Sequence, residues 1–172
     1  NGGALITQRA QPGTAGTQNA GLMFGGEQNN VGVTTTEEYN GTAWSSANAM
    51  INASAFLAGT GTQNAGLKFG GGHPSGHACT EQYDGTTWAA GGALNNARFG
   101  LAGAGTQFDA WAMGGNSVSQ RTENYNGVTW SIYKAMPIGQ DLNSGTGGAS
   151  STNMLSIGGA GNTCATQRLE YA

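Results

Sequence analysis

Both histidines of the chain lie in one short stretch that ends in a cysteine. His73 and His77 fall within residues 73–79, and Cys79 closes the stretch. Imidazole and thiolate groups hold Zn²⁺ and copper in proteins, so these residue types suit a metal site. An exposed polar loop that holds both histidines by chance explains the same pattern. We expect no metal or other cofactor, and we name His73 and His77 as the candidates if one is bound.

A glutamate recurs at one spacing along the chain, two residues before a tyrosine, as Glu37, Glu81 and Glu123. Carboxylates gathered in a ring could form a binding or catalytic site. A side chain that recurs with the fold is more simply explained as a contact between neighbouring repeats, made to a backbone N–H or a threonine hydroxyl. The fourth repeat is expected to carry Leu169 at this position, which would leave an acidic ring incomplete. We therefore predict a structural role for the three glutamates.

Residue patterns typical of catalysis are missing from the sequence. It has no recognisable Ser-His-Asp set, phosphate-binding loop or paired-carboxylate motif. The glutamines at residues 18, 63 and 107 recur like the glutamates, and we expect them to form hydrogen bonds at turns or between repeats. The sequence thus favours a protein that is not an enzyme. The alternative is a metal-dependent enzyme or metal-binding protein that uses the loop of His73 and His77.

The elements that must position these residues come from an internal repeat. The motif GTQNAGLMFGG ends at Gly26, GTQNAGLKFGG at Gly71 and GTQFDAWAMGG at Gly115, and the diverged copy ASSTNMLSIGG ends at Gly159. The copies are therefore 44 or 45 residues apart. A tyrosine and then a tryptophan follow each of the first three glycine pairs. A period of this length is the signature of a repeat architecture.

Each repeat reads as four short strands. In the second repeat we expect strands over residues 55–62, 66–69, 79–83 and 86–90. Asp84 and Gly85 are expected to form a two-residue hairpin turn with both residues at positive φ. A four-stranded antiparallel sheet that recurs at this period is typical of a propeller blade. One small sheet cannot bury its own apolar faces, so we expect the tyrosines and tryptophans to fill the gaps between blades.

The fourth repeat ends before its tryptophan, and the start of the chain could supply the missing strand. We expect residues 4–8 to form the outermost strand of the last blade and to close the ring, which removes exposed strand edges. The predicted fold is an all-β, four-bladed propeller of four antiparallel strands per blade. It forms one domain over residues 1–172, with blades at about 10–50, 51–94 and 95–137, and at 138–172 together with 1–9.

The amino-acid composition limits the classes of partner that the protein is expected to bind. The chain has 172 residues, a net charge of −3 and only 6 Lys and Arg, so no basic surface for nucleic acid is expected. No run approaches the 18 consecutive apolar residues of a membrane span, so we expect no membrane insertion. High glycine and low charge could indicate a disordered linker, but evenly spaced aromatic residues argue for a folded domain.

These motifs together resemble kelch repeats, in which a double glycine ends the second strand, a tyrosine lies in the third and a tryptophan in the fourth. The residue sequence of the repeats is similar to that of kelch-like repeat proteins of marine bacteriophages. The resemblance implies a virion or extracellular surface role and binding rather than chemistry. Some kelch proteins, similar to galactose oxidase, carry copper. Kelch rings commonly have six or seven blades, so four departs from the family pattern.

The loops between the second and third strands differ most between repeats, so we place the binding surface there. We expect it to contact a partner protein or a glycan, within a homo-oligomer or a larger virion or surface assembly. A structural spacer without a ligand remains a third possibility. The predicted binding residues are Glu27, Gln28, Asn29, Asn30, His73, His77, Asn116, Gln120 and Asn162.

Overall fold

The computed structural model describes residues 2–72, 75–116 and 119–141, and the backbone of three further strands. The described chain is all-β and contains no helix, and therefore none that could span a membrane. The first sheet contains β1 (Gly13–Thr17), β2 (Ala20–Phe24), β5 (Thr36–Tyr39) and β6 (Trp44–Ala47). The second contains β7 (Ala58–Thr62), β8 (Ala65–Phe69), β9 (Thr80–Tyr83) and β10 (Trp88–Gly91). The third contains β11 (Ala102–Gly105), β12 (Ala110–Met113), β13 (Thr122–Tyr125) and β14 (Trp130–Tyr133). The fourth contains β15 (Ser144–Gly147), β16 (Asn153–Ile157) and β17 (Thr166–Glu170), and β3 (Glu27–Gln28) and β4 (Val31–Gly32) form a small separate hairpin.

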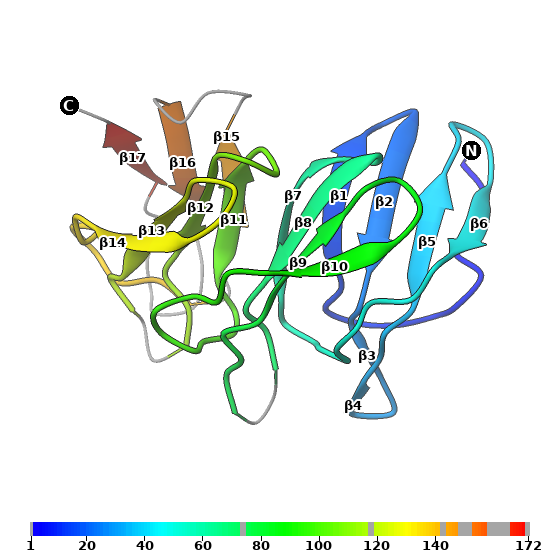
Figure 1. Cartoon of the computed structure of the whole chain (residues 1–172), viewed down its shortest axis with the longest axis horizontal. Coiled ribbons are helices and arrows are strands. Elements are labelled where there is room, and N and C mark those ends of the chain that lie inside the picture. The colour runs from blue at the N-terminus through cyan, green and yellow to red at the C-terminus, as the bar shows by residue number, and fades with distance from the viewer. Residues whose placement is uncertain are drawn as a thin grey trace.

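The four sheets stand side by side in chain order (Figure 1). Each of the first three is antiparallel, and its strands follow one another in sequence apart from the β3–β4 hairpin, which is inserted between β2 and β5. The first strands of the sheets, β1, β7, β11 and β15, contact one another in turn. The N-terminus and β17 lie at opposite ends of the row in this view. The repeated four-stranded sheet is therefore confirmed, whereas closure into a ring stays a prediction.

Close contact between the inner strands depends on glycine. A Cβ atom on Gly59 of β7 would stand 2.6 Å from the carbonyl oxygen of Thr14 in β1, and one on Gly103 of β11 would stand 2.9 Å from that of Gly59. Both distances are shorter than non-bonded atoms tolerate. Glycine in the first strands thus lets neighbouring sheets approach closely.

Aromatic side chains form the core between sheets. Trp88 of the second sheet packs edge-on against Phe24 of the first, with ring centroids 5.0 Å apart. Trp130 of the third packs against Phe69 of the second at 4.8 Å. These four side chains are all buried. The aromatic positions of the second and third repeats therefore fill the gaps between sheets, as the repeat spacing predicts.

The turn between the third and fourth strands differs from the prediction. Tyr83 pairs with Trp88, so the loop has four residues instead of two. Gly85 has a φ of 91°, but Asp84 is not at positive φ. The Asp84 carboxylate accepts hydrogen bonds from the backbone N–H groups of Thr86 and Thr87 at 2.8 and 2.7 Å. A side chain that caps the turn from its first position explains why aspartate and asparagine recur there.

The N-terminal segment also differs from the prediction. Residues 4–8 form no strand, and the structure places them against the first sheet. The Gly3 N–H donates to the Thr42 carbonyl oxygen at 2.9 Å. The Ile6 and Thr7 N–H groups donate to the Glu37 carboxylate at 2.8 and 3.1 Å. The segment thus takes the place that the linker between two sheets takes further along the chain, and its backbone donors are used by a side chain rather than by a strand.

The register of the fourth sheet corrects one further expectation. Thr166 pairs with Ile157, and Gln167 pairs with Ser156. In the first sheet the corresponding pairs are Thr36 with Phe24 and Glu37 with Met23. Gln167, and not Leu169, therefore occupies the repeat position of the glutamates.

Candidate functional site

Loops from the first three sheets gather along one side of the row, the lower side in Figure 1. We call this side the loop face. It holds the connections between the second and third strands and the linkers between sheets. The β3–β4 hairpin projects from it, with Asn29 and Asn30 at its tip at φ values of 53° and 61°. Asparagine tolerates this left-handed conformation better than most residues. The hairpin therefore presents Gln28, Asn29 and Asn30 to solvent.

Two hollows flank this hairpin. One, of about 400 Å³, is lined by Gln8, Arg9, Ala10, Glu27, Gln28 and Asn29. The other, of about 230 Å³, lies between the hairpin and the second sheet, and its lining includes Glu27, Asn30, Ser54 and His77. The structure thus brings five predicted binding residues, Glu27, Gln28, Asn29, Asn30 and His77, to one part of the loop face.

His77 is held by its backbone. Its N–H donates to the Gly71 carbonyl oxygen at 2.7 Å, and its carbonyl oxygen accepts from the Arg98 N–H at 3.2 Å. Its Nδ1 atom is buried and has no hydrogen-bond partner among the described residues. Those residues hold no group of three or more histidine, cysteine, aspartate or glutamate side chains able to bind a metal ion. His73 and Asn162 lie outside the described residues, so the two-histidine metal site stays untested.

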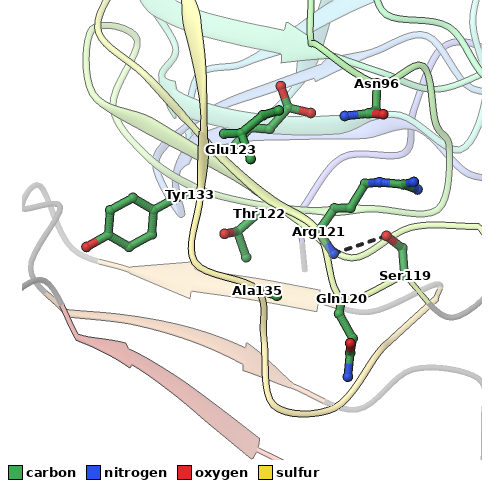
Figure 2. A pocket seen from close by; sticks show the side chains of 9 residues that line it. Asn96, Ser119, Gln120, Arg121, Thr122, Glu123, Tyr133 and Ala135 are labelled. Carbon is green, nitrogen blue, oxygen red and sulfur yellow. Dashed lines mark hydrogen bonds between the residues drawn. The ribbon is translucent and has the colours of Figure 1, made fainter.

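A third hollow of about 410 Å³ lies on the loop face of the third sheet (Figure 2). Ser119, Gln120, Arg121, Thr122 and Glu123 form one wall, and Ile132, Tyr133, Ala135 and Asn96 complete the lining. Gln120 is the only residue of this lining that was predicted as a binding residue. We call this hollow the third-sheet cavity.

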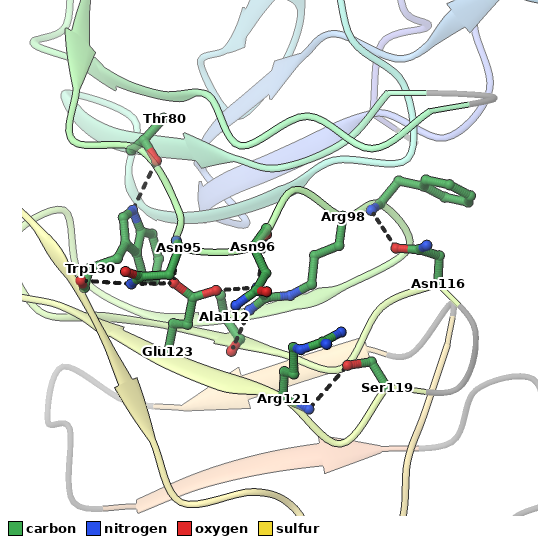
Figure 3. Close-up of polar contacts among 11 residues, drawn as sticks. Thr80, Asn95, Asn96, Arg98, Ala112, Asn116, Ser119, Arg121, Glu123 and Trp130 are labelled. Carbon is green, nitrogen blue, oxygen red and sulfur yellow. Dashed lines mark hydrogen bonds and ion pairs between the residues drawn. The ribbon is translucent and has the colours of Figure 1, made fainter.

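Asn116 has a structural role here. Its Oδ1 atom accepts a hydrogen bond from the Phe99 N–H at 3.3 Å, and its own N–H donates to the Phe99 carbonyl oxygen at 2.8 Å (Figure 3). These bonds join the loop after β12 to the linker before β11. Asn116 therefore braces the loop face and lines none of the three hollows described above.

The recurring glutamates are fully buried and bind backbone N–H groups, as the repeat pattern predicts. Glu81 accepts from the N–H groups of Ile51 and Asn52 at 2.8 and 3.1 Å. Glu123 accepts from the Asn95 N–H at 2.7 Å (Figure 3). Each carboxylate thus fixes the linker that enters its sheet, which gives a buried charge the hydrogen bonds that it needs.

Each of these carboxylates also has a buried cation, which the sequence reasoning missed. The pairs are Arg9 with Glu37 at 3.0 Å, Lys68 with Glu81 at 3.4 Å, and Arg98 with Glu123. Burial lowers the pKa of the Arg9 guanidinium, while the charge of Glu37 and its hydrogen bond oppose this shift. The three pairs neutralise charge that would otherwise be costly inside the protein.

Side chains bridge the second and the third sheet to the one before it. The Gln63 amide donates to the carbonyl oxygens of Gly21 and Tyr39 at 3.0 and 2.9 Å. Gln107 in the next repeat donates to those of Gly66 and Tyr83 at 3.0 and 2.7 Å. The expectation of hydrogen bonds between repeats is confirmed for both glutamines. Gln18, at the same position of the first repeat, is exposed and has no hydrogen bond to the described residues.

No known protein-family model and no curated protein matches this chain. Sequence reasoning missed Asn96, Arg121 and Ile132 of the third-sheet cavity, although Arg121 and Ile132 carried a signal. They depart from the repeat, since the corresponding residues of the first sheet are Thr35 and Ser46.

Proposed function

We propose that the chain is a non-enzymatic binding module that contacts a glycan or a partner protein through its loop face. The observation that carries this proposal is the division of polar groups in the molecule. The recurring carboxylates are buried in ion pairs, whereas exposed amide side chains line hollows on the loop face. Exposed amides in shallow hollows suit recognition of polar ligands, and loops on a rigid scaffold are where binding sites commonly lie.

The proposal includes a four-bladed, kelch-like propeller as the scaffold, in a virion or an extracellular protein. Support for ring closure comes from the first sheet, whose Gln18, Tyr39 and Trp44 are less buried than their counterparts in the next two repeats. In those repeats, the Trp88 and Trp130 indole N–H groups donate to Thr36 and Thr80 of the preceding sheet at 3.0 and 2.9 Å.

The observed register of β17 places Thr166 at the repeat position of those two threonines. In a closed ring, the Trp44 indole would therefore lie against β17 as the Trp88 indole lies against β5, shielded from solvent. Hydrogen exchange of the tryptophan indole N–H groups tests this. Closure predicts that Trp44 is as protected as Trp88, and exchange of Trp44 at the rate of an exposed indole would contradict it.

Binding is tested with the intact chain on a glycan array and by capture of proteins from a host-cell surface preparation. The loop-face variant carries Gln28→Ala, Asn29→Gly and Asn30→Gly, because glycine keeps the positive φ of the two asparagines. The control is Phe108→Asn, at an exposed turn on the opposite side of the molecule. This change installs the residue that the second repeat has at the same position, Asn64. We expect the loop-face variant to lose binding and the control to keep it. Equal binding by both variants would place the ligand elsewhere.

The buried, unpartnered Nδ1 atom of His77 supports the second candidate function, a metal-binding protein or metal-dependent enzyme. Titration of the intact chain with Zn²⁺ and Cu²⁺ by calorimetry tests this candidate. Stoichiometric binding that is lost in both His73→Ala and His77→Ala would favour it over the binding module. Absence of saturable metal binding would exclude it.

A further inference from the structure

The third-sheet cavity differs from the rest of the molecule in its charge. The chain has 6 lysines and arginines, and the ion pairs with the recurring glutamates bury three of them, Arg9, Lys68 and Arg98. Arg121 and Lys134 are two of the remaining three, and both are exposed on the third sheet. In a chain with a net charge of −3, the exposed lysine and arginine side chains of the described residues are thus both on the third sheet, and Arg121 lines its cavity.

The repeat provides an internal control for Arg121. The residues at its position in the first two repeats are Thr35 and Cys79, and in all three sheets the carbonyl oxygen of this residue accepts a hydrogen bond from a glycine N–H. The fold therefore uses the backbone carbonyl at this position, and it also forms when the side chain is small. Ile132 is a second departure, being 70% exposed where the first two repeats have Ser46 and Ala90. Fold alone explains neither side chain.

Three polar side chains of this cavity are available to a ligand. The Arg121 guanidinium and the Asn96 side-chain amide make no hydrogen bond or ion pair with the described residues, and Figure 2 draws both on the lining. Gln120 uses its amide nitrogen to donate to the Pro137 carbonyl oxygen at 3.1 Å, which leaves its Oε1 atom free. The carboxylate of Glu123 is neutralised by Arg98. Arg121 therefore sets the charge of the cavity.

We propose that the third-sheet cavity binds an acidic sugar and that Arg121 pairs with its carboxylate. A guanidinium forms two parallel hydrogen bonds with a carboxylate, a geometry that lysine does not provide. Asn96 and Gln120 supply an amide donor and an amide acceptor for ring hydroxyls, and the exposed Ile132 offers an apolar surface to the C–H face of a sugar. The volume of about 410 Å³ lies within the range of small-ligand pockets. This inference rests on the proposed glycan-binding function and names its ligand class.

The test uses two matched probes, trigalacturonic acid and its fully methyl-esterified form. Both have the same sugar hydroxyls, and only the acid carries charge. Binding to the isotope-labelled intact chain is followed by amide chemical shifts. We expect the acid to shift the signals of residues 119–123 and to bind about tenfold or more tightly than the ester, since hydrogen bonds to a charged group are stronger than those to a neutral one.

Two variants locate the site. Arg121→Thr installs the residue of the first repeat, so the fold is retained, and it should weaken binding of the acid to the level of the ester. Phe108→Asn on the opposite side should leave binding unchanged. Equal binding of acid and ester, or an unchanged affinity in Arg121→Thr, would overturn the assignment.

A tetraglutamate peptide distinguishes an acidic protein partner. Binding of this peptide at residues 119–123 in preference to trigalacturonic acid would overturn the sugar assignment in favour of a protein ligand. If the chain binds neutral glycans on an array and Arg121→Thr does not alter this, the acidic-sugar inference fails while the proposed function stands. If neither glycan nor protein binds anywhere on the loop face, both fail.

Discussion

The second and third sheets neutralise a buried glutamate in two different ways. Both bury a glutamate that fixes the preceding linker, but the neutralising cation comes from different elements. In the third sheet it is Arg98 of the linker, which also donates to the Ala112 carbonyl oxygen at 3.3 Å. In the second sheet the linker has Ser54 at that position, and the cation is Lys68 of β8 itself.

The first sheet repeats the arrangement of the third, with Arg9 in the linker and Met23 at the position of Lys68. The fold therefore requires one positive charge beside each of the three glutamates and accepts it from either the linker or the second strand. The repeat conserves the charge balance of the site rather than the residue at any one position. The second sheet also differs from the third in the partner of its tyrosine hydroxyl and in the first residue of its turn.

The largest effect is expected from removing the carboxylates. Glu123→Gln leaves Arg98 buried without a counter-charge, and breaking a buried pair in this way costs about 3–5 kcal/mol. Glu81→Gln should cost less, because a buried lysine can release its proton whereas arginine cannot. Free energies of unfolding from urea titrations measure both, with Lys134→Gln at an exposed position as the control. A smaller loss in Glu123→Gln than in Glu81→Gln would contradict the comparison.

Exchanging the cation between its two sources should restore stability. Lys68→Met leaves Glu81 buried and unpaired, at a cost of about 3 kcal/mol. Adding Ser54→Arg copies the arrangement of Arg9 and Met23 into the second sheet. We expect the double variant to recover most of the loss, measured as a coupling energy in a double-mutant cycle.

Arg98→Ser with Ala112→Lys makes the reverse exchange in the third sheet. The two cycles should give coupling energies of the same sign. Additive effects in both cycles would show that the cation position is fixed by something other than the charge of the glutamate.

A smaller difference is expected between the tyrosine hydroxyls. Tyr83 donates to the Glu38 carboxylate at 2.7 Å, whereas the Tyr125 hydroxyl accepts from the Gln82 amide at 3.1 Å. Tyr83→Phe should cost about 1.5–3 kcal/mol and Tyr125→Phe about 0.5–1.5 kcal/mol, because a hydrogen bond to a charged group is the stronger. Equal losses in urea unfolding would mean that the charge of Glu38 adds nothing.

The difference in stability between the native protein and Tyr83→Phe should depend on pH. Burial, followed by the hydrogen bond to Glu38, raises the pKa of Tyr83 in the folded protein. A raised pKa contributes stability fully below the unfolded value of about 10 and loses it as pH rises further. The stability advantage of the native protein over Tyr83→Phe should therefore be constant up to about pH 9 and fall above about pH 10.

The smallest effect is expected at the turns, where Asp84 stands in the place of Asn40 and Asn126. The hydrogen bond from the Thr87 N–H, followed by that from Thr86, lowers the pKa of the Asp84 carboxyl. A lowered pKa contributes stability above the unfolded value of about 3.9 and loses it as pH falls through the folded value. Asp84→Asn should remove this dependence, so its melting temperature should drop less than that of the native protein below about pH 4.

Conversely, Asn126→Asp should introduce the same acid sensitivity into the third sheet. Parallel melting curves for both variants and the native protein across pH 2–6 measure this. Identical slopes for all three proteins would show that neither turn carboxylate is coupled to folding.

The repeat made the strands and the structural glutamates predictable from sequence. Fixed spacing located Glu81 and Glu123, and the linkers they bind followed from the fold. Their cations were not predictable in the same way, because Lys68 and Arg98 occupy different repeat positions. A comparison of equivalent repeat positions therefore misses a cation that lies on a strand in one repeat and on a linker in another.

The turn and the candidate site show two other limits of the sequence. Asp84-Gly85 has the residues of a two-residue turn, but the pairing of Tyr83 with Trp88 decides the loop length. Loop variability located the loop face, but Arg121 lies directly before β13, outside the variable loops. Departure from the repeat at strand ends is the signal that finds it.

The bridging glutamines give the row of sheets a direction. Gln63 and Gln107 each reach back to the preceding sheet, and Trp88 and Trp130 do the same through their indole N–H groups. At these two junctions, the glutamine and indole donors therefore belong to one repeat and their acceptors to the repeat before it. A duplication of a single 44-residue unit in the gene would supply both halves of a new junction at once. The row of sheets could thus lengthen or shorten by whole repeats during evolution, with the glutamine and tryptophan contacts of each new junction supplied by the inserted repeat.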